Sequence, residues 1–204
     1  MARRNASQQQ ELDLPTWGGR RDRAGRPRRA LRPSVPHRAR QVFRHRRAAH
    51  VTLRFARHVV NLRTHFTRKL LERILLRANG RFDTRIVQLA ILDDHIHLLV
   101  ESASHQALAS AMKGLSVRLG IHLNRLMMDS GRRVMGDRYH VHLLKTPTEV
   151  RHASHYIRNN FRKHELQRGR VFDGVDRYSS WGDFSTVVLP VTLFLIDKAL
   201  RPPS

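Results

Sequence analysis

Between residues 50 and 144 the hydrophobic pattern switches repeatedly between the period of a strand and the period of a helix. Four short stretches alternate apolar and polar residues, as strands with one buried face do. Their apolar residues are Val51, Leu53 and Phe55; Val87, Leu89 and Ile91; Ile96, Leu98 and Val100; and Tyr139, Val141 and Leu143. With two helical stretches between them, the order predicts an α+β, ferredoxin-like βαββαβ fold: an antiparallel four-stranded sheet with both helices on one face.

The two helical stretches run from Asn61 to about Asn79 and from about Ser104 to Gly131. Asn79-Gly80 is a typical helix stop, and Ser104 is a suitable N-cap for the second helix. We interpret the apolar stripes as core: Leu62, Phe66, Leu70 and Ile74 in the first helix, and Leu108, Met112, Leu115, Leu119, Leu123 and Leu126 in the second.

An additional helix is predicted after the fourth strand. It would begin at Thr146, with proline at the first helical position and Glu149 three residues after the cap. Its apolar stripe is Val150, Ala153, Ile157 and Phe161. Tyr156 and Asn160 are four residues apart, so their side chains share one face beside this stripe.

Histidines gather on the predicted sheet. His95 and His97 are two residues apart on a strand, so both imidazoles point to the same face. That face, which we expect to be open, also carries Arg54, His140 and His142. The fourth strand lies about 10 Å from the third, so one ion is not expected to bind both histidine pairs. The pattern indicates a binding site, although a His-x-His pair alone is weak evidence for a metal.

The charge of the chain indicates a polyanionic partner. Lys and Arg number 39 against 16 Asp and Glu, a formal net charge of +23. Nucleic acid is the favoured partner, ahead of an anionic membrane surface. The chain has no cysteine, which excludes thiolate zinc sites and is compatible with a reducing cytoplasm. We predict an Arg-rich disordered arm over 1–49, a domain over 50–165, and a C-terminal extension of unclear role over 166–204.

The motif His95-Ile96-His97, followed by a helix that carries Tyr156 and Asn160, resembles the single-tyrosine HUH transposases, which include the REP-associated tyrosine transposases. The resemblance spans about 50–164, and residues 136–140 (Gly-Asp-Arg-Tyr-His) are also similar to that family. Where family members usually have Pro-Asn before the first histidine, this chain has Asp93-Asp94.

The resemblance implies a DNA transposase that cleaves and rejoins single-stranded or hairpin DNA. Tyr156 would be the nucleophile and form a 5′-phosphotyrosine, and His95, His97 and Asn160 would hold one Mg²⁺ or Mn²⁺. Five residues are assigned to DNA contact: Arg54, His140, His142, His152 and Arg158. The protein would be cytoplasmic and nucleoid-associated, and the sequence leaves monomer and homodimer open.

Other interpretations stay open at this stage. Tyr156 could serve packing alone, and His152 could contact metal instead of phosphate. The main alternative function is a non-catalytic nucleic-acid-binding protein on the same fold, derived from a transposase. An RNA-binding sheet would need exposed aromatic residues on its open face, and a water-using metallohydrolase would need a carboxylate placed by a motif.

Overall fold

A computed structural model describes residues 39–129 and 131–200 of the chain. Residues 1–38, most of the predicted arm, lie outside the described residues. The first strand begins at Arg47, three residues before the expected start of the domain. Among the described residues, no helix has the length and apolar character needed to cross a membrane.

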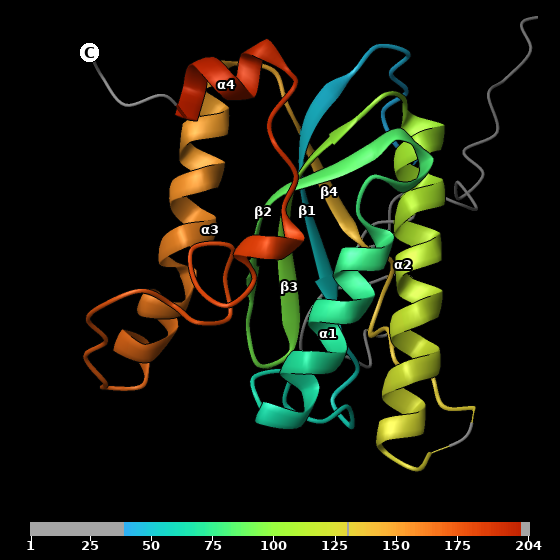
Figure 1. The fold of residues 1–204 in the computed structure, drawn as a ribbon, viewed down its shortest axis with the longest axis vertical. Helices are drawn as coiled ribbons and strands as arrows, with labels where there is room; N and C mark the ends of the chain where they lie inside the picture. The colour runs from blue at the N-terminus through green and yellow to red at the C-terminus, as the bar shows by residue number, and fades with distance from the viewer. Residues whose placement is uncertain (1–38, 130, 201–204) are drawn as a thin grey trace, which may run out of the picture. The chain divides into compact units, whose positions relative to one another are not determined.

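Four strands form one sheet in the order β2-β3-β1-β4, and all neighbouring strands are antiparallel (Figure 1). This order and the alternation of strands and helices confirm the predicted ferredoxin-like plan. The strands are β1 Arg47–Arg54, β2 Thr84–Ile91, β3 His95–Ser102 and β4 His140–Leu144.

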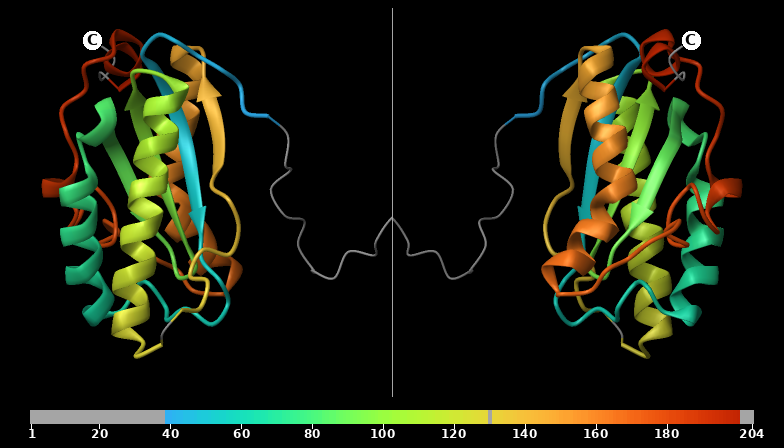
Figure 2. Two further views of the ribbon diagram at one scale, coloured as in Figure 1. Left: turned by 90° about the vertical axis from the view of Figure 1, so that its right-hand side faces the viewer. Right: turned by 90° about the vertical axis from the view of Figure 1, so that its left-hand side faces the viewer.

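Helices lie on both faces of the sheet (Figure 2). α1 (His65–Ala78) and α2 (His105–Leu126) cover one face, and α3 (Pro147–Gln167) covers the other. The short elements are the 3₁₀ turns η1 (Arg81–Asp83) and η2 (Ser185–Val187) and the last helix, α4 (Phe194–Leu200). The expectation of an open second face was wrong. Ala48, Leu99 and Leu144 make part of that face apolar, and α3 buries them with Val150 and Ile157.

The helix stripes were predicted with two errors. Phe66 is 77% exposed and Leu126 is 40% exposed. α1 begins at His65 rather than Asn61, because the Thr64 hydroxyl accepts a hydrogen bond from the Thr67 N–H and caps the helix there. The residues that α1 buries are therefore Thr67, Leu71, Ile74 and Leu75. The predicted Ser104 cap of α2 is confirmed by its bond from the Ala107 N–H.

A bulge in β2 corrects the predicted facing of one residue. Ile86 pairs with Val100, but Gln88 pairs with the very next residue of β3, Leu99, so Val87 is an extra residue in the ladder. Ile86 consequently joins the core under α1 and α2, and Val87 turns to the α3 face. Alternation alone had placed Val87 with the first core.

The C-terminal segment packs on this domain. Segment 178–180 runs along β2, where the Ile91 N–H donates to the Tyr178 carbonyl and the Ser180 N–H donates to the Leu89 carbonyl. Farther on, fully buried Glu101 accepts hydrogen bonds from the Thr192 N–H (2.9 Å), the Leu193 N–H (2.7 Å) and the Thr192 hydroxyl (2.5 Å). One carboxylate of β3 thus holds the segment that leads into α4.

Substitution of Glu101 by alanine should lower the free energy of unfolding by roughly 3 kcal/mol, because it removes a buried carboxylate that accepts from two main-chain N–H groups and one hydroxyl. Urea denaturation of full-length protein would measure the loss. Glu72→Ala is the control, since Glu72 accepts a long, 3.5 Å bond from exposed Thr186 and its loss should cost below about 1 kcal/mol. Equal effects of the two substitutions would contradict the anchoring role.

Candidate metal and nucleophile site

β3 places His95 and His97 on the sheet face that α3 covers. Their ring centroids are 4.8 Å apart and the side chains are almost perpendicular. Both residues are buried, with exposed fractions of 8% and 3%. The alternation of β3 produces this placement, because Ile96 and Leu98 between and beyond them enter the core under α1 and α2.

Each of these histidines is held through its Nδ1 atom. His95 Nδ1 lies 2.6 Å from the Asp94 carboxylate. His97 Nδ1 lies 3.0 Å from His50 Nε2 and 3.1 Å from the Thr52 hydroxyl, both on β1. The Nε2 atom of His97 is buried and has no hydrogen-bond partner among the described residues. With Nδ1 engaged, Nε2 is the ring atom that each histidine can offer to an ion.

Burial favours the neutral form of the His97 and His50 imidazoles. Burial, together with the nearby His95, His50 and His164, lowers the pKa of His97 to about 2. Burial also lowers the pKa of His50 to about 4, with further contributions from His140 and His142. A neutral imidazole keeps the lone pair that a metal ligand needs, so the low pKa of His97 favours metal binding over protonation.

α3 brings Tyr156 to this pair. The Tyr156 ring lies 5.2 Å from the His97 ring and 5.7 Å from the His50 ring, both in edge-on contact. Tyr156 stays 42% exposed, although Ile157 beside it is fully buried against the sheet. The helix start is as predicted: the Thr146 hydroxyl accepts from the Glu149 N–H. The Tyr156 side chain therefore lies beside the His97 and His50 imidazoles and is accessible to a substrate from solvent.

Asn160 supplies the third group of the predicted set. It lies one helical turn after Tyr156 and is 3% exposed, and its amide nitrogen has no hydrogen-bond partner within residues 39–129 and 131–200. In the part of the chain that the structure describes, no three His, Cys, Asp or Glu side chains gather closely enough to hold a metal. The predicted ligand set therefore depends on a group of another type, the Asn160 carboxamide. A carboxamide oxygen is such a ligand and suits Mg²⁺ or Mn²⁺, so the residues present fit the ion.

Two further histidines belong to the site and were not predicted from the sequence. His50 contacts both His97 and Tyr156, and the alternation of β1, which puts it on the face of Arg54, was the available signal. His164 is two turns after Tyr156 on α3, and its ring lies 5.8 Å from that of His95. Between His95 and His164 is a cavity of about 20 Å³, enough for a single water molecule.

The five predicted DNA-contact residues are only partly brought together. His140 and His142 are exposed on β4 and lie close enough to influence His50. Arg54 is exposed at the end of β1 and pairs in register with His95. His152 is exposed on α3, one turn before Tyr156. Arg158 is also exposed, but it lies over the Trp181 ring and lines a different cavity.

A buried ion pair fixes α3 near the histidines. Arg63 donates to both carboxylate oxygens of Asp176, at 2.7 and 3.1 Å, and to the Ile91 carbonyl at 2.6 Å. Its guanidinium also stacks on the Phe161 ring of α3 (3.6 Å) and on the Tyr178 ring (4.4 Å). This one side chain joins β2, α3 and the C-terminal segment.

Comparison with known proteins identifies the family. A family model described as "Transposase IS200 like" matches residues 44–160, more than half of the chain. The chain belongs to the IS200-like transposase family. The matched range contains His95, His97, Tyr156 and Asn160, and the predicted membership of the single-tyrosine HUH transposases is confirmed. No curated protein matches this transposase.

Several solved structures are similar to this IS200-like transposase, and two of them illustrate the likeness. One is a REP-associated tyrosine transposase bound to a REP hairpin, with a TM-score of 0.54 and 13% identity over 72% of this chain and 83% of that one. The other is described as a putative transposase from Deinococcus radiodurans, with a TM-score of 0.42 and 12% identity over 66% and 99% of the two chains. At this identity, the first match supports the fold.

Proposed function

We propose that this transposase cleaves and rejoins single-stranded DNA through a 5′-phosphotyrosine on Tyr156, with the help of one divalent metal ion. The observation that carries the proposal is the position of Tyr156, 5.2 Å from the ring of His97, whose Nε2 atom is buried without a partner. Metal-assisted cleavage of a phosphodiester needs a nucleophile close to a side-chain atom that is available to bind the metal ion.

His95, His97 and Asn160 would hold the ion, either Mg²⁺ or Mn²⁺. When bound, it would neutralise charge on the non-bridging oxygens of the scissile phosphate. Two imidazoles and one amide form an uncharged ligand set, which binds a hard cation weakly and leaves positions for phosphate oxygens.

In the proposed reaction, the Tyr156 hydroxyl loses its proton and its oxygen attacks the phosphorus. The new bond joins tyrosine to the 5′-phosphate, and the bond to the 3′ oxygen breaks; this oxygen takes up a proton and leaves as a 3′-hydroxyl. A 3′-hydroxyl from the same or another end can later reverse the step. The phosphotyrosine link conserves the energy of the cleaved phosphodiester bond, so no nucleoside triphosphate is required.

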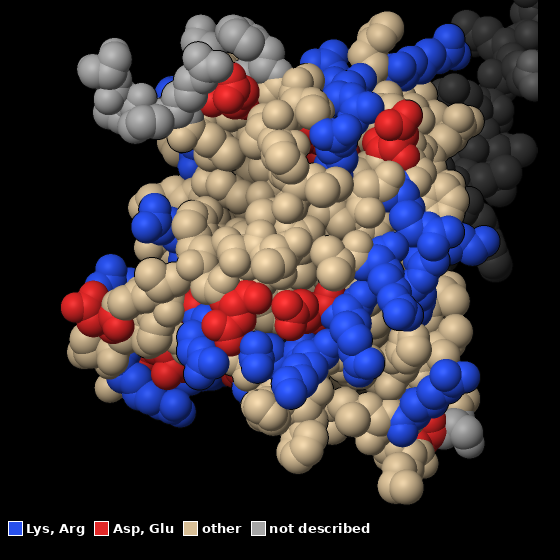
Figure 3. All heavy atoms as spheres, in the orientation of Figure 1, with Lys and Arg blue, Asp and Glu red and all other residues tan. Residues whose placement is uncertain are grey.

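DNA hairpins are the proposed substrate. The net charge of +23 favours a polyanion, and the similar REP-associated transposase was solved with a REP hairpin. Figure 3 shows Lys and Arg side chains gathered in a band over α1 and α2, so positive charge extends beyond the candidate site. We assign DNA contacts to Arg54, His140, His142, His152 and Arg158 and expect a cytoplasmic, nucleoid-associated protein, as a monomer or a homodimer.

The function is tested by incubating the full-length protein with end-labelled single-stranded hairpins drawn from the neighbourhood of its own gene. We expect cleavage and a denaturation-resistant protein–DNA adduct that require Mn²⁺ or Mg²⁺ and disappear with chelator. Tight binding without cleavage on any of these hairpins would refute the enzymatic proposal and support the alternative, a non-catalytic DNA-binding protein.

His50 should control how tightly the ion binds. His50 Nε2 lies 3.0 Å from His97 Nδ1, and this contact would hold the ring so that Nε2 of His97 faces the ion. The loss of such a partner typically weakens metal affinity 10- to 100-fold. We expect His50→Ala to weaken Mn²⁺ binding in this range by calorimetry, and His50→Gln to restore part of the affinity. His122→Ala, on α2, is the control and should leave the affinity unchanged; the same result for His50→Ala would disprove the role.

A further inference from the structure

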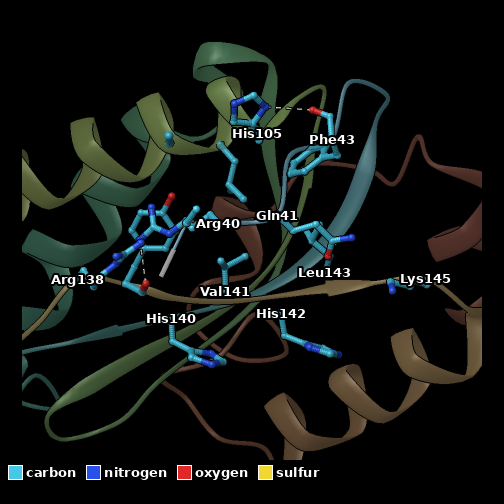
Figure 4. Close-up of a pocket in the computed structure, with 14 residues that line it drawn as sticks. Arg40, Gln41, Phe43, His105, Arg138, His140, Val141, His142, Leu143 and Lys145 are labelled. Atoms are coloured by element: carbon cyan, nitrogen blue, oxygen red, sulfur yellow. Dashed lines mark hydrogen bonds between the residues drawn. The ribbon is translucent and has the colours of Figure 1, made fainter. Parts of the chain in front are cut away.

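A cavity of about 380 Å³ opens at the free edge of β4 (Figure 4). Its walls come from three places: segment 39–43, the first turns of α2, and residues 138–145 in and around β4. Within the described residues β4 pairs with β1 alone, so its outer edge presents unpaired N–H and C=O groups beside the cavity. A volume of this size accommodates a small planar ligand.

The walls combine apolar surface with positive charge. Phe43, Val141 and Leu143 supply apolar and aromatic surface. Arg40, Arg138 and Lys145 contribute cations, and none of the described residues lining the cavity is Asp or Glu. The cavity therefore suits a ligand that has an apolar planar part and a negatively charged part.

A stacked pair stands at one end of the cavity. The Arg40 guanidinium lies 3.4 Å from the centre of the Tyr139 ring and donates to the Tyr139 carbonyl at 3.1 Å. Burial raises the pKa of the Tyr139 hydroxyl and lowers that of the Arg40 guanidinium, so the pair is partly shielded from water. Proteins bind unpaired nucleobases on such aromatic and guanidinium planes.

β4 also connects this cavity to the candidate active site. Figure 4 shows Val141 on the α2 side of the strand and His140 and His142 on the opposite side. Those histidines lie near His50, which contacts Tyr156. The cavity and these histidines therefore lie on opposite faces of the same edge strand.

We propose that this cavity binds one unpaired nucleotide from the single-stranded DNA that flanks the hairpin. The base would stack in the aromatic and apolar part, its polar edge would bond to the open edge of β4, and its phosphate would meet Arg138 or Lys145. The inference rests on the proposed function in one respect, that DNA is the substrate. It adds a second DNA contact, separate from the cleavage site, that would determine which base is accepted in the flanking sequence.

The test uses full-length Tyr156→Phe protein, in which we expect cleavage to be eliminated, and hairpins with 2-aminopurine at each flank position in turn. We expect one position to change fluorescence on binding. Ala109→Phe, which fills the cavity from α2, should abolish that change and weaken binding of flanked hairpins about tenfold relative to the bare hairpin. Ser110→Phe puts the same ring on the exposed neighbouring position and should have no effect.

Arg138→Gln is a second variant, which removes charge without filling the space and should reduce the same signal. No change at any flank position, or an unaltered signal in Ala109→Phe, would overturn the inference while hairpin binding persists. Failure to bind the bare hairpin would instead overturn the proposed function, and this inference with it.

Discussion

Replacing Tyr156 by phenylalanine is expected to eliminate the covalent protein–DNA adduct and to lower cleavage by at least roughly 10³-fold. The substitution removes only the hydroxyl oxygen that would bond to phosphorus. The ring contacts with His97 and His50 remain, so the fold, the metal affinity and the hairpin affinity should stay within about twofold of wild type. The measurement is a denaturing gel of labelled hairpin with Mn²⁺, together with binding titrations of the same proteins.

Tyr178→Phe is the matched control for this prediction. Tyr178 contacts Arg63 and Phe184 through its ring, far along the chain from the histidine pair, and its hydroxyl has no proposed chemical role. It should keep full adduct formation. An adduct that survives in Tyr156→Phe would assign the nucleophile to another residue, whereas an adduct lost equally in both variants would indicate a structural defect.

Replacing Arg63 by alanine is expected to lower the free energy of unfolding by about 3–5 kcal/mol, because Asp176 would be left buried without its partner. The Asp176 side chain is only 5% exposed and the Arg63 side chain 11%. The variant also loses both stacking contacts, including the one to Phe161 on α3. Since α3 carries Tyr156 and Asn160, Mn²⁺ affinity should fall as well. Denaturant unfolding and calorimetry measure the two effects.

Arg162→Ala is the control for Arg63. Arg162 pairs with Asp173 at 3.1 Å, but both side chains are exposed, at 59% and 92%, and such pairs typically contribute less than 1 kcal/mol. A loss for Arg63→Ala no larger than that for Arg162→Ala would show that the buried ion pair does not hold α3. If the Arg63→Ala protein is strongly destabilised but keeps its Mn²⁺ affinity, Arg63 stabilises the fold without positioning the metal ligands.

Local patterns predicted the elements of the fold because each is determined by short-range physics. The alternation of Ile96, Leu98 and Val100 indicates which face of β3 carries His95 and His97. The cap at Thr146 and the spacing of four between Tyr156 and Asn160 fix the relation of those two side chains before any packing is known. These features depend on neighbours within a few residues.

Features that depend on distant parts of the chain were mispredicted or missed. The bulge at Val87 depends on how β2 and β3 pair, and periodicity along β2 alone does not reveal it. The second sheet face seemed open because no local pattern states which surface a third helix will cover. His50 was overlooked for the same reason: its role arises from a partner 47 positions away.

The sequence by itself therefore determined the order of the elements, the facing of the histidine pair and the geometry of the tyrosine helix. Only the tertiary structure decided that α3 packs over the histidine face, that His50 holds His97, and that Glu101 and Arg63 attach the C-terminal segment. Periodicity and capping are local, whereas burial of the second face and pairing of its charged groups require residues that meet only when the chain has folded.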